Sequence, residues 1–492
     1  MAGLVLGVLL ASLAMPDHGD TEVVGSGGSS AGVESFETGA EAEAAPADGG
    51  QTAPSGGDPS GGGGSATQAP GEATTPTEGS APAPGAPAPS AGPGAEVPPA
   101  PRANVRGVTA SSIKIGVVYL DLGALKQLGP RFDIGDVRKQ WEAVLDRWRR
   151  EKVVPVHGRD VELVFKTFDP IQSDTQRPAC VSMVQDHKVF AVVALMYFPI
   201  GSECVAREFD TPLITLDGPT EEVMKRSHPY LFTLSPTEDR ILRNWIHWAH
   251  AHRLLAGKKI GLYRPAEKAG ADLIARTVEA ELDKLGYELT AEVAQDGPAS
   301  DALAVQRFKS AGVDLALLAV AGKSGFLQQA DTQGYKPKYL DSDYQFGTGD
   351  TTASTYSVDQ WDGTPGMTTR REGEFNAGGK PDPAQEACLA NYERFSGEKL
   401  ERKNTGETHY ALTTCDEADV LMHALQTAGP ALDPARFIAA LETINGMPLR
   451  RVPSITFTPT KHHGSEQQRT VVWRKSCACW HAQGQFAPLW IR

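Results

Sequence analysis

The stretch Val108-Thr-Ala-Ser-Ser-Ile-Lys-Ile-Gly-Val-Val-Tyr119 decides the fold of this chain, because it joins a turn to a β-branched, apolar strand. Strand-like and helix-like segments alternate from this point as far as residue 345. Such alternation predicts a parallel sheet with helices on both faces, whose ligand sites lie at the carboxyl ends of the strands. The sequence therefore predicts an α/β fold.

Two segments of unusual composition precede this strand. Residues 1–15 are almost wholly apolar and too short to span a bilayer, so we expect a signal peptide and export of the chain. An apolar N-terminus without a targeting role is the alternative. The lack of a basic residue before the apolar run leaves a start further upstream open, and no cysteine follows the run to carry a lipid anchor.

Residues 16–106 consist mainly of Gly, Pro, Ala, Ser and Thr, with twelve acidic and two basic residues. This composition predicts a disordered linker, because it cannot bury enough apolar surface to offset chain entropy. Most of the chain's net charge of −14 falls in this segment. The acidic balance argues against a nucleic-acid partner.

The spacing of the cysteines suggests a disulfide framework, since an even number in an exported chain favours bridges over reactive thiols. We expect the pairs Cys180–Cys204 and Cys388–Cys415, each joining neighbouring helices. Cys477 and Cys479 are left over, and a bridge between them needs a kinked backbone. A soft-metal site in Cys477-Ala-Cys-Trp-His481 is the less favoured alternative.

Periodicity predicts two similar series of elements, followed by a helical region. The first series has strands at 113–119, 161–168, 189–196 and 212–216, with helices at 134–150, 173–187 and 202–209. The second has strands at 259–263, 288–294, 313–320 and 337–341, with helices at 237–253, 268–285, 300–311 and 323–333. Helices at 383–397, 407–427 and 433–445 and short C-terminal strands follow. The repeated rhythm suggests two α/β lobes.

Several motifs do not specify an enzyme. Ala321-Gly-Lys-Ser324 stands where a phosphate loop would, but Leu317 occupies the position of its required glycine; the helix start could still face an anion. His247, His250 and His252 share one predicted helix without a carboxylate or cysteine to complete a metal site, so a packed or solvated face is favoured. With no marked nucleophile or acid–base pair, we expect no enzyme, cofactor or metal.

The opening stretch resembles the mature start of type I periplasmic binding proteins of the leucine/isoleucine/valine-binding family, the extracytoplasmic receptors of ABC importers. Residues 158–169, 190–194, 211–215 and 312–316 match the family in order and spacing, so the resemblance covers roughly residues 107–492. It implies two Rossmann-like lobes with parallel sheets, joined by a three-stranded hinge and closing on a ligand. Lobe 1 would comprise residues 107–236 with 366–450, and lobe 2 residues 237–365 with 451–492.

The resemblance also implies ligand-binding residues by position. These are Tyr197, Phe198, Ser202, Gly218, Thr220, Ala321, Lys323, Asp343 and Tyr344. The Thr220 hydroxyl would donate to a carboxylate, and the Gly218 carbonyl and Asp343 would receive an ammonium group. The first loop departs from the Ser-rich pattern of amino-acid binders, because Tyr197-Phe-Pro-Ile200 stands there. These rings hint at an aromatic or apolar ligand, with packing between lobes as the alternative.

The sequence thus predicts an exported, monomeric solute-binding receptor for a small molecule. An amino acid or related carboxylate or aromatic compound is the expected ligand, and an ABC permease at the membrane is the expected partner. A sensory module without transport is the alternative, because the fold alone does not separate the two roles. A secreted enzyme is less favoured.

Overall fold

The computed structural model describes residues 105–122, 133–169, 173–403 and 405–491. The predicted signal peptide and nearly all of the predicted linker lie outside the described residues. Among the described residues, no helix is both long and apolar enough to cross a membrane.

The first sheet contains five parallel strands in the order β2-β1-β3-β4-β5. They are β1 (Ser112–Leu120), β2 (Asp160–Phe168), β3 (Ala191–Ala194), β4 (Leu213–Thr215) and β5 (Leu231–Thr233). Every residue of β3 is buried, which suits an apolar strand covered by helices on both faces. β5 is the one strand of this sheet that the sequence did not predict.

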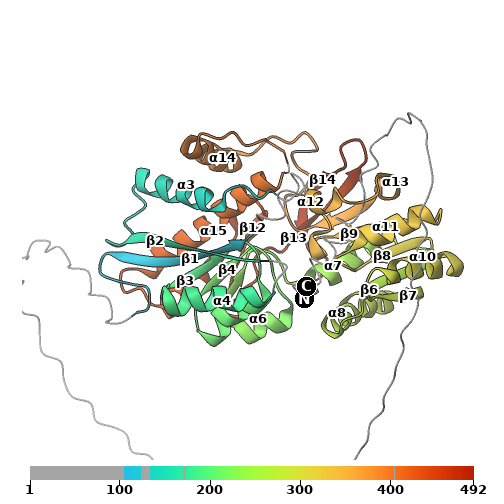
Figure 1. Cartoon of the computed structure of the whole chain (residues 1–492), viewed down its shortest axis with the longest axis horizontal. Helices are drawn as coiled ribbons and strands as arrows, with labels where there is room; N and C mark the ends of the chain where they lie inside the picture. Colours follow the sequence, from blue (N-terminus) through green and yellow to red (C-terminus); the bar gives the residue numbers. More distant parts are fainter. Residues whose placement is uncertain (1–104, 123–132, 170–172, 404, 492) are drawn as a thin grey trace, which may run out of the picture. The chain divides into compact units, whose positions relative to one another are not determined.

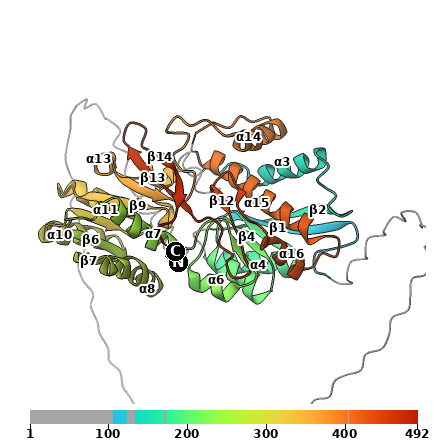
Figure 2. The same cartoon turned by 180° about the vertical axis from the view of Figure 1, so that it is seen from behind.

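Helices from distant parts of the chain cover this sheet. One face carries α3 (Val137–Arg150), α14 (Pro383–Ser396), α15 (Gly406–Ala428) and α16 (Pro434–Leu441), which share one apolar core with β1 and β3. The other face carries α4 (Gln176–Val181), α5 (Pro199–Glu203) and α6 (Glu221–Ser227). Figures 1 and 2 show α15 and α16 beside the early strands, although more than 200 residues separate them in sequence.

The second sheet has seven strands in the order β14-β13-β10-β9-β8-β6-β7. They are β6 (Ile260–Pro265), β7 (Leu289–Gln295), β8 (Leu315–Leu318), β9 (Lys338–Ser342), β10 (Pro365–Thr368), β13 (Gln467–Arg474) and β14 (Cys479–Pro488). β6 to β10 run parallel, whereas β13 and β14 pair in antiparallel register. The sheet therefore ends in a C-terminal hairpin.

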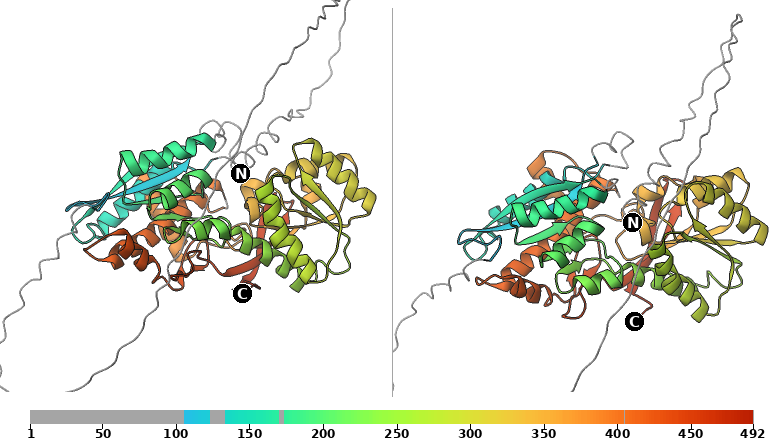
Figure 3. Two further views of the ribbon diagram at one scale, coloured as in Figure 1. Left: turned by 90° about the horizontal axis from the view of Figure 1, so that it is seen from below. Right: turned by 60° about the horizontal axis from the view of Figure 1, so that its bottom comes forward.

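Two apolar cores cover the faces of the second sheet. One contains α7 (Glu238–Ala251), α8 (Lys268–Ile274) and α9 (Ala280–Lys284). The other contains α10 (Ala299–Ala311), α11 (Lys323–Thr332) and the short helices α12 (Asp350–Ala353) and α13 (Val358–Trp361). In Figure 3 the red C-terminal strands lie beside the yellow elements of this sheet. The mixed α/β fold with two sheets is the one that the sequence predicted.

Three crossovers connect the elements of the two sheets, and backbone hydrogen bonds join them. The first lies between β5 and α7, the second between β10 and α14, and the third follows the small hairpin of β11 (Met447–Pro448) and β12 (Ser454–Ile455). The Ser465 amide donates to the Leu234 carbonyl at 3.0 Å, and the Arg371 amide donates to the Arg451 carbonyl at 2.9 Å. β10 belongs to the second sheet, so the lobe boundary expected at residue 365 falls inside this strand; the lobe boundaries stay a prediction.

All six cysteines lie within the described residues and are paired. The structure contains the two predicted bridges, Cys180–Cys204 and Cys388–Cys415. It also joins Cys477 to Cys479. Ala478 between them has a φ of 50°, which supplies the kinked backbone that a bridge over two positions needs.

Candidate functional site

The loop that follows β4 lies against the first crossover. A Cβ atom on Gly218 would stand 2.2 Å from the Pro236 carbonyl oxygen, so only glycine permits this approach. Thr220 ends the loop as the N-cap of α6, where its hydroxyl oxygen accepts from the Val223 amide at 3.4 Å. The Thr220 hydroxyl proton therefore remains available to an acceptor.

The first turn of α7 is bonded to the same loop. The Glu238 amide donates to the Pro219 carbonyl at 3.2 Å. The Asp239 carboxylate accepts from the Glu221 amide at 2.9 Å and pairs with Arg276 at 2.9 Å. The loop at the carboxyl end of the first sheet is thus fixed to the helix that opens the second series of elements.

The loop after β3 divides into a packed part and a polar part. The Phe198 ring stacks on Phe168 with centroids 5.2 Å apart, and the Phe198 amide donates to the Ser202 hydroxyl at 3.2 Å. Both Phe198 and Ser202 are fully buried. The Tyr197 hydroxyl is buried without a hydrogen-bond partner among the described residues, and burial raises its pKa.

The predicted residues near the strands of the second sheet mostly have protein partners. Lys323, the first residue of α11, forms a buried ion pair with Asp341 of β9. Asp343 accepts hydrogen bonds from the Thr369 amide and hydroxyl, each at 2.6 Å, and from Thr348. Both carboxylate oxygens of Asp343 are therefore engaged within the protein.

Two more of the predicted ligand-binding residues, Ala321 and Tyr344, lie near the strands of the second sheet. Ala321 is half-buried, just before α11. Tyr344 is buried among the residues of the α7 core, and burial followed by the charge of Glu238 raises its pKa. Tyr344 therefore lies close to the first turn of α7, beside the loop that carries Gly218 and Thr220.

The second crossover adds a cation that the sequence did not single out. Arg370 pairs with Asp217 of the β4 loop, and its guanidinium lies 5.7 Å from the centre of the Phe346 ring. The Arg370 Nε and the Asp217 Oδ2 atoms are buried without partners among the described residues. Sequence reasoning missed Arg370 because β10, the strand that positions it, begins with Pro365 and Gly366, residue types that are depleted in strands.

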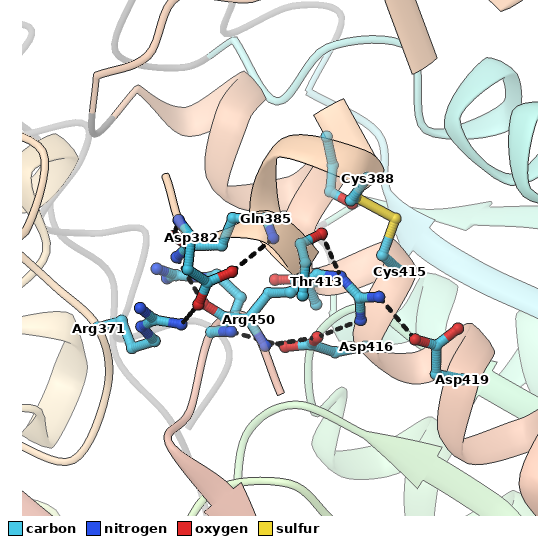
Figure 4. A network of polar contacts seen from close by, with 12 residues as sticks. Arg371, Asp382, Gln385, Cys388, Thr413, Cys415, Asp416, Asp419 and Arg450 are labelled. Carbon is cyan, nitrogen blue, oxygen red and sulfur yellow. Dashed lines mark hydrogen bonds and ion pairs between the residues drawn. A yellow bond between two sulfur atoms is a disulfide. The ribbon is translucent and has the colours of Figure 1, made fainter. Parts of the chain in front are cut away.

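A network of charged groups surrounds the second crossover and the turn of the β11–β12 hairpin (Figure 4). Arg450 pairs with Asp416 at 3.1 Å and with Asp419 at 2.7 Å, beside the Cys388–Cys415 bridge. Burial raises the pKa of Asp416 to about 6, although Arg450 opposes the rise. The ion pairs of Arg450 join the β11–β12 hairpin to α15.

A second buried group continues the network. Arg451 donates to Glu372 at 2.8 Å, and His409 lies 3.6 Å from the same carboxylate. Burial alone would raise the pKa of Glu372, but the charge and hydrogen bond of Arg451, with the charge of Arg370, outweigh it and lower the pKa to about 2. Burial and Arg451 lower the pKa of His409 to about 3, so this imidazole is neutral.

The histidines that the sequence placed on one helix have separate hydrogen-bond partners. His247 bonds Glu281 at 3.0 Å, His250 bonds the Tyr287 hydroxyl at 2.9 Å, and His252 bonds the Trp248 carbonyl at 2.9 Å. Each ring thus points to a different group, as expected for a packed helix face.

Two groups of possible metal ligands occur among the described residues. Cys477 and Cys479 lie near His481, but the disulfide withholds their thiolates. In the other group, His462 bonds Glu442 at 3.0 Å and its ring stacks on the ring of His228. The second ring nitrogen partner in this group is the Pro459 carbonyl, 2.9 Å from His228 Nε2, and the His462 ring also stacks on Phe232, so both rings have partners within the protein.

The comparison with known proteins agrees with the fold described above. A family model described as periplasmic binding protein matches residues 112–478. No curated protein matches the chain.

Several solved structures share the fold. A solute-binding protein of an ABC transporter from Rhodopseudomonas palustris BisB5, in complex with 3,4-dihydroxybenzoic acid, is 17% identical with a TM-score of 0.57, covering 77% of this chain and 98% of that chain. A branched-chain amino acid ABC transporter protein from Thermus thermophilus with bound valine is 15% identical with a TM-score of 0.58, covering 77% and 97%. A possible leucine/isoleucine/valine-binding protein from Rhodopirellula baltica SH 1 is 14% identical with a TM-score of 0.58, covering 78% and 98%.

Proposed function

The chain belongs to the periplasmic binding protein family, and we propose that it is an exported solute-binding receptor that delivers a small molecule to an ABC permease. Members of this family are binding proteins, and two of the similar solved structures carry 3,4-dihydroxybenzoic acid and valine, respectively. We therefore propose a ligand with a carboxylate and an apolar or aromatic body. Lobe closure around the ligand would present the receptor to its permease.

The observation that carries the proposal is a group of buried polar atoms without partners at the carboxyl end of the first sheet. The Tyr197 hydroxyl, Asp217 Oδ2 and Arg370 Nε atoms belong to this group. Buried polar atoms are normally hydrogen-bonded, so these three unpartnered atoms beside the ends of β3, β4 and β10 favour a ligand site there.

The ligand-binding residues remain those expected from the resemblance. Within that set, the half-buried Thr220 supports direct contact because its hydroxyl proton is available. Phe198, Ser202, Lys323 and Asp343 have partners within the protein. We propose that these four shape the walls of the site, while Tyr197, Gly218, Thr220, Ala321 and Tyr344 face the ligand.

Thermal unfolding of the purified chain with a panel of amino acids and aromatic carboxylates tests the proposal. A specific ligand at 100 times its Kd should stabilise the native state by about 2.7 kcal/mol through mass action. The shift should grow with ligand concentration and saturate in a titration at one molecule per chain. A chain that none of the panel stabilises, and that carries no bound molecule after native purification, would contradict a receptor role.

A further inference from the structure

The bridge between Cys477 and Cys479 differs from the other two disulfides in its exposure to solvent. The four cysteines of the other bridges are at most 3% exposed. Cys477 lies exposed in the turn that joins β13 to β14, whereas Cys479, the first residue of β14, is 8% exposed. An external thiolate must reach one sulfur of a disulfide to open it. Of the three bridges, which include every cysteine of the chain, this one therefore offers a sulfur to a thiol in solution or on another protein.

The backbone of the turn favours opening of this bridge. Ala478 has a φ of 50°, which is unfavourable for a residue with a Cβ atom because this atom crowds the backbone. Reduction of the bridge would let the turn relax. The bridge also closes a loop with a sequence separation of only 2, so it restricts the unfolded chain little. Opening it thus relieves backbone strain and removes little support from the fold.

Other contacts hold the rest of the hairpin. Trp480 is fully buried in one apolar core of the second sheet, and its amide donates to the Asp350 carboxylate at 2.7 Å. The Ala482 amide donates to the Gly373 carbonyl at 3.1 Å. β14 would therefore keep Cys479 in place after reduction, so that both sulfurs stay close enough for the bridge to form again.

The imidazole of His481 lies next to the exposed sulfur. His481 Nε2 is 3.4 Å from Cys477 Sγ. One ring nitrogen of His481 and the two cysteine sulfurs all lie within 4.8 Å of one another. A protonated imidazole this close favours a thiolate over a thiol. It therefore makes the sulfur a better leaving group when the bridge opens and a more abundant nucleophile when the bridge forms again.

Other charged groups lie around the turn. Arg474 and Lys475 are exposed cations where β13 ends. Two acids come from α13 and its end. Asp359 lies 3.8 Å from the Lys475 ammonium group, and the Asp362 carboxylate accepts from the Lys475 amide at 3.0 Å. Both acids thus face Lys475, and His481 is the titratable group that contacts a cysteine sulfur.

We propose that Cys477 and Cys479 form a redox-active centre that exchanges with a dithiol, and that His481 stabilises the Cys477 thiolate. One thiolate of the dithiol attacks Cys477 Sγ, the bond between the two cysteines breaks, and its electron pair leaves on Cys479 Sγ, which takes up a proton. The second thiolate of the dithiol then attacks the dithiol sulfur that is bound to Cys477, and the Cys477 thiolate leaves beside His481. Two electrons and two protons pass to the cysteines, and the dithiol becomes a disulfide. The reverse sequence forms the bridge again.

Equilibration of the native protein with mixtures of reduced and oxidised glutathione tests the redox activity. Free thiols are blocked with N-ethylmaleimide, and mass spectrometry of the tryptic peptides reports the state of each bridge. The Cys477–Cys479 bridge should be partly reduced in mixtures that leave both buried bridges intact, because structural disulfides resist glutathione. With dithiothreitol, a small dithiol, it should open at least about 100-fold faster than either buried bridge. It should form again when oxidised glutathione is added.

The pH dependence of alkylation tests the role of His481. In the reduced protein, the rate at which iodoacetamide modifies Cys477 follows its thiolate fraction. At pH 6, His481→Gln should react roughly 3- to 10-fold more slowly than wild type, and the difference should shrink above pH 9, where the thiolate forms without help. His250→Gln is the matched control, because this exposed histidine of α7 bonds the Tyr287 hydroxyl. The control should react as wild type does.

Two results would overturn the proposal. One is a Cys477–Cys479 bridge that stays oxidised in every glutathione mixture that spares the buried bridges, or that opens no faster than they do. The other is a His481→Gln variant whose Cys477 is alkylated with the same pH profile as in wild type. Neither result changes the receptor function, which ligand-induced stabilisation tests separately.

Discussion

Arg370 of the second crossover and Asp217 of the β4 loop form a buried ion pair. The pair joins the segment that leaves the second sheet to the carboxyl end of the first. Each side chain keeps one buried polar atom without a partner among the described residues. A buried ion pair whose polar atoms are not all hydrogen-bonded adds little net stability to the folded state. This agrees with a role for the pair in the ligand site.

Removing one member of this pair should be costly. Asp217→Ala leaves Arg370 buried without its counter-charge, so the free energy of unfolding should fall by about 3 to 5 kcal/mol. Denaturant unfolding of the ligand-free protein measures the loss. Glu222→Ala, which breaks the exposed pair with Arg226, serves as the control and should cost less than about 1 kcal/mol. Equal losses in both variants would show that Arg370 does not depend on Asp217.

The bridge between Cys388 and Cys415 should carry substantial stability. It joins α14 to α15 across a sequence separation of 27 residues. In the chain-entropy model, replacing both cysteines by serine should cost about 3 to 4 kcal/mol. The Cys477–Cys479 bridge spans a separation of 2, so its double serine variant should lose less than half as much. Unfolding curves of the two double variants should differ accordingly, and coincident curves would contradict the expectation.

Glu238 should make stability depend on pH in ligand-free protein. Its pKa of about 8 in the folded state exceeds the ordinary value of 4.5, so the folded state holds the proton more tightly than the unfolded state does. The resulting stabilisation is present below pH 4.5 and is lost as pH rises towards 8 and beyond. Glu238→Gln should remove this decline, making the variant increasingly more stable than wild type between pH 5 and pH 9. If the free energy of unfolding changed with pH in the same way in both proteins, the pKa of Glu238 would be ordinary and the prediction would be wrong.

Thr220 should contribute affinity through its hydroxyl. Thr220→Ala removes a donor to the ligand's carboxylate, so affinity should fall by roughly 1.5 to 3 kcal/mol. Thr220→Ser keeps the hydroxyl and the N-cap of α6 and should bind nearly as well as wild type. Calorimetry compares the variants with the ligand identified from purified protein. A serine variant as weak as the alanine variant would point to lost packing of the methyl group instead.

Much of the fold could be predicted from the sequence because many of its elements have strong local patterns. The apolar strands β1 and β3, the capped helices and the cysteine spacing each reflect local chemistry that one chain segment contains. β5 and β10 were missed for separate reasons: β5 is a run of three residues between Pro229 and Pro236, and β10 begins with Pro365 and Gly366, residue types that are depleted in strands. Pairing fixes their place, since β5 pairs with β4 and β10 lies between β9 and the distant strand β13, and local pattern does not encode such pairing.

Less of the candidate site could be predicted from the sequence. The resemblance located the loops around Tyr197, Gly218 and Thr220, but the partners of each side chain depend on tertiary contacts. Asp343 is engaged by Thr369, and this threonine follows the unpredicted strand β10. The ion pair of Asp239 likewise depends on where Arg276 lies, 37 residues further along the chain.

Native mass spectrometry of the chain, purified without denaturation, tests the receptor function most directly. We predict one small molecule bound per chain, released on denaturation and rebound on refolding, with occupancy sharply reduced in Thr220→Ala. A wild-type chain with no bound molecule, which also fails to bind any amino acid or aromatic carboxylate added at millimolar concentration, would contradict it.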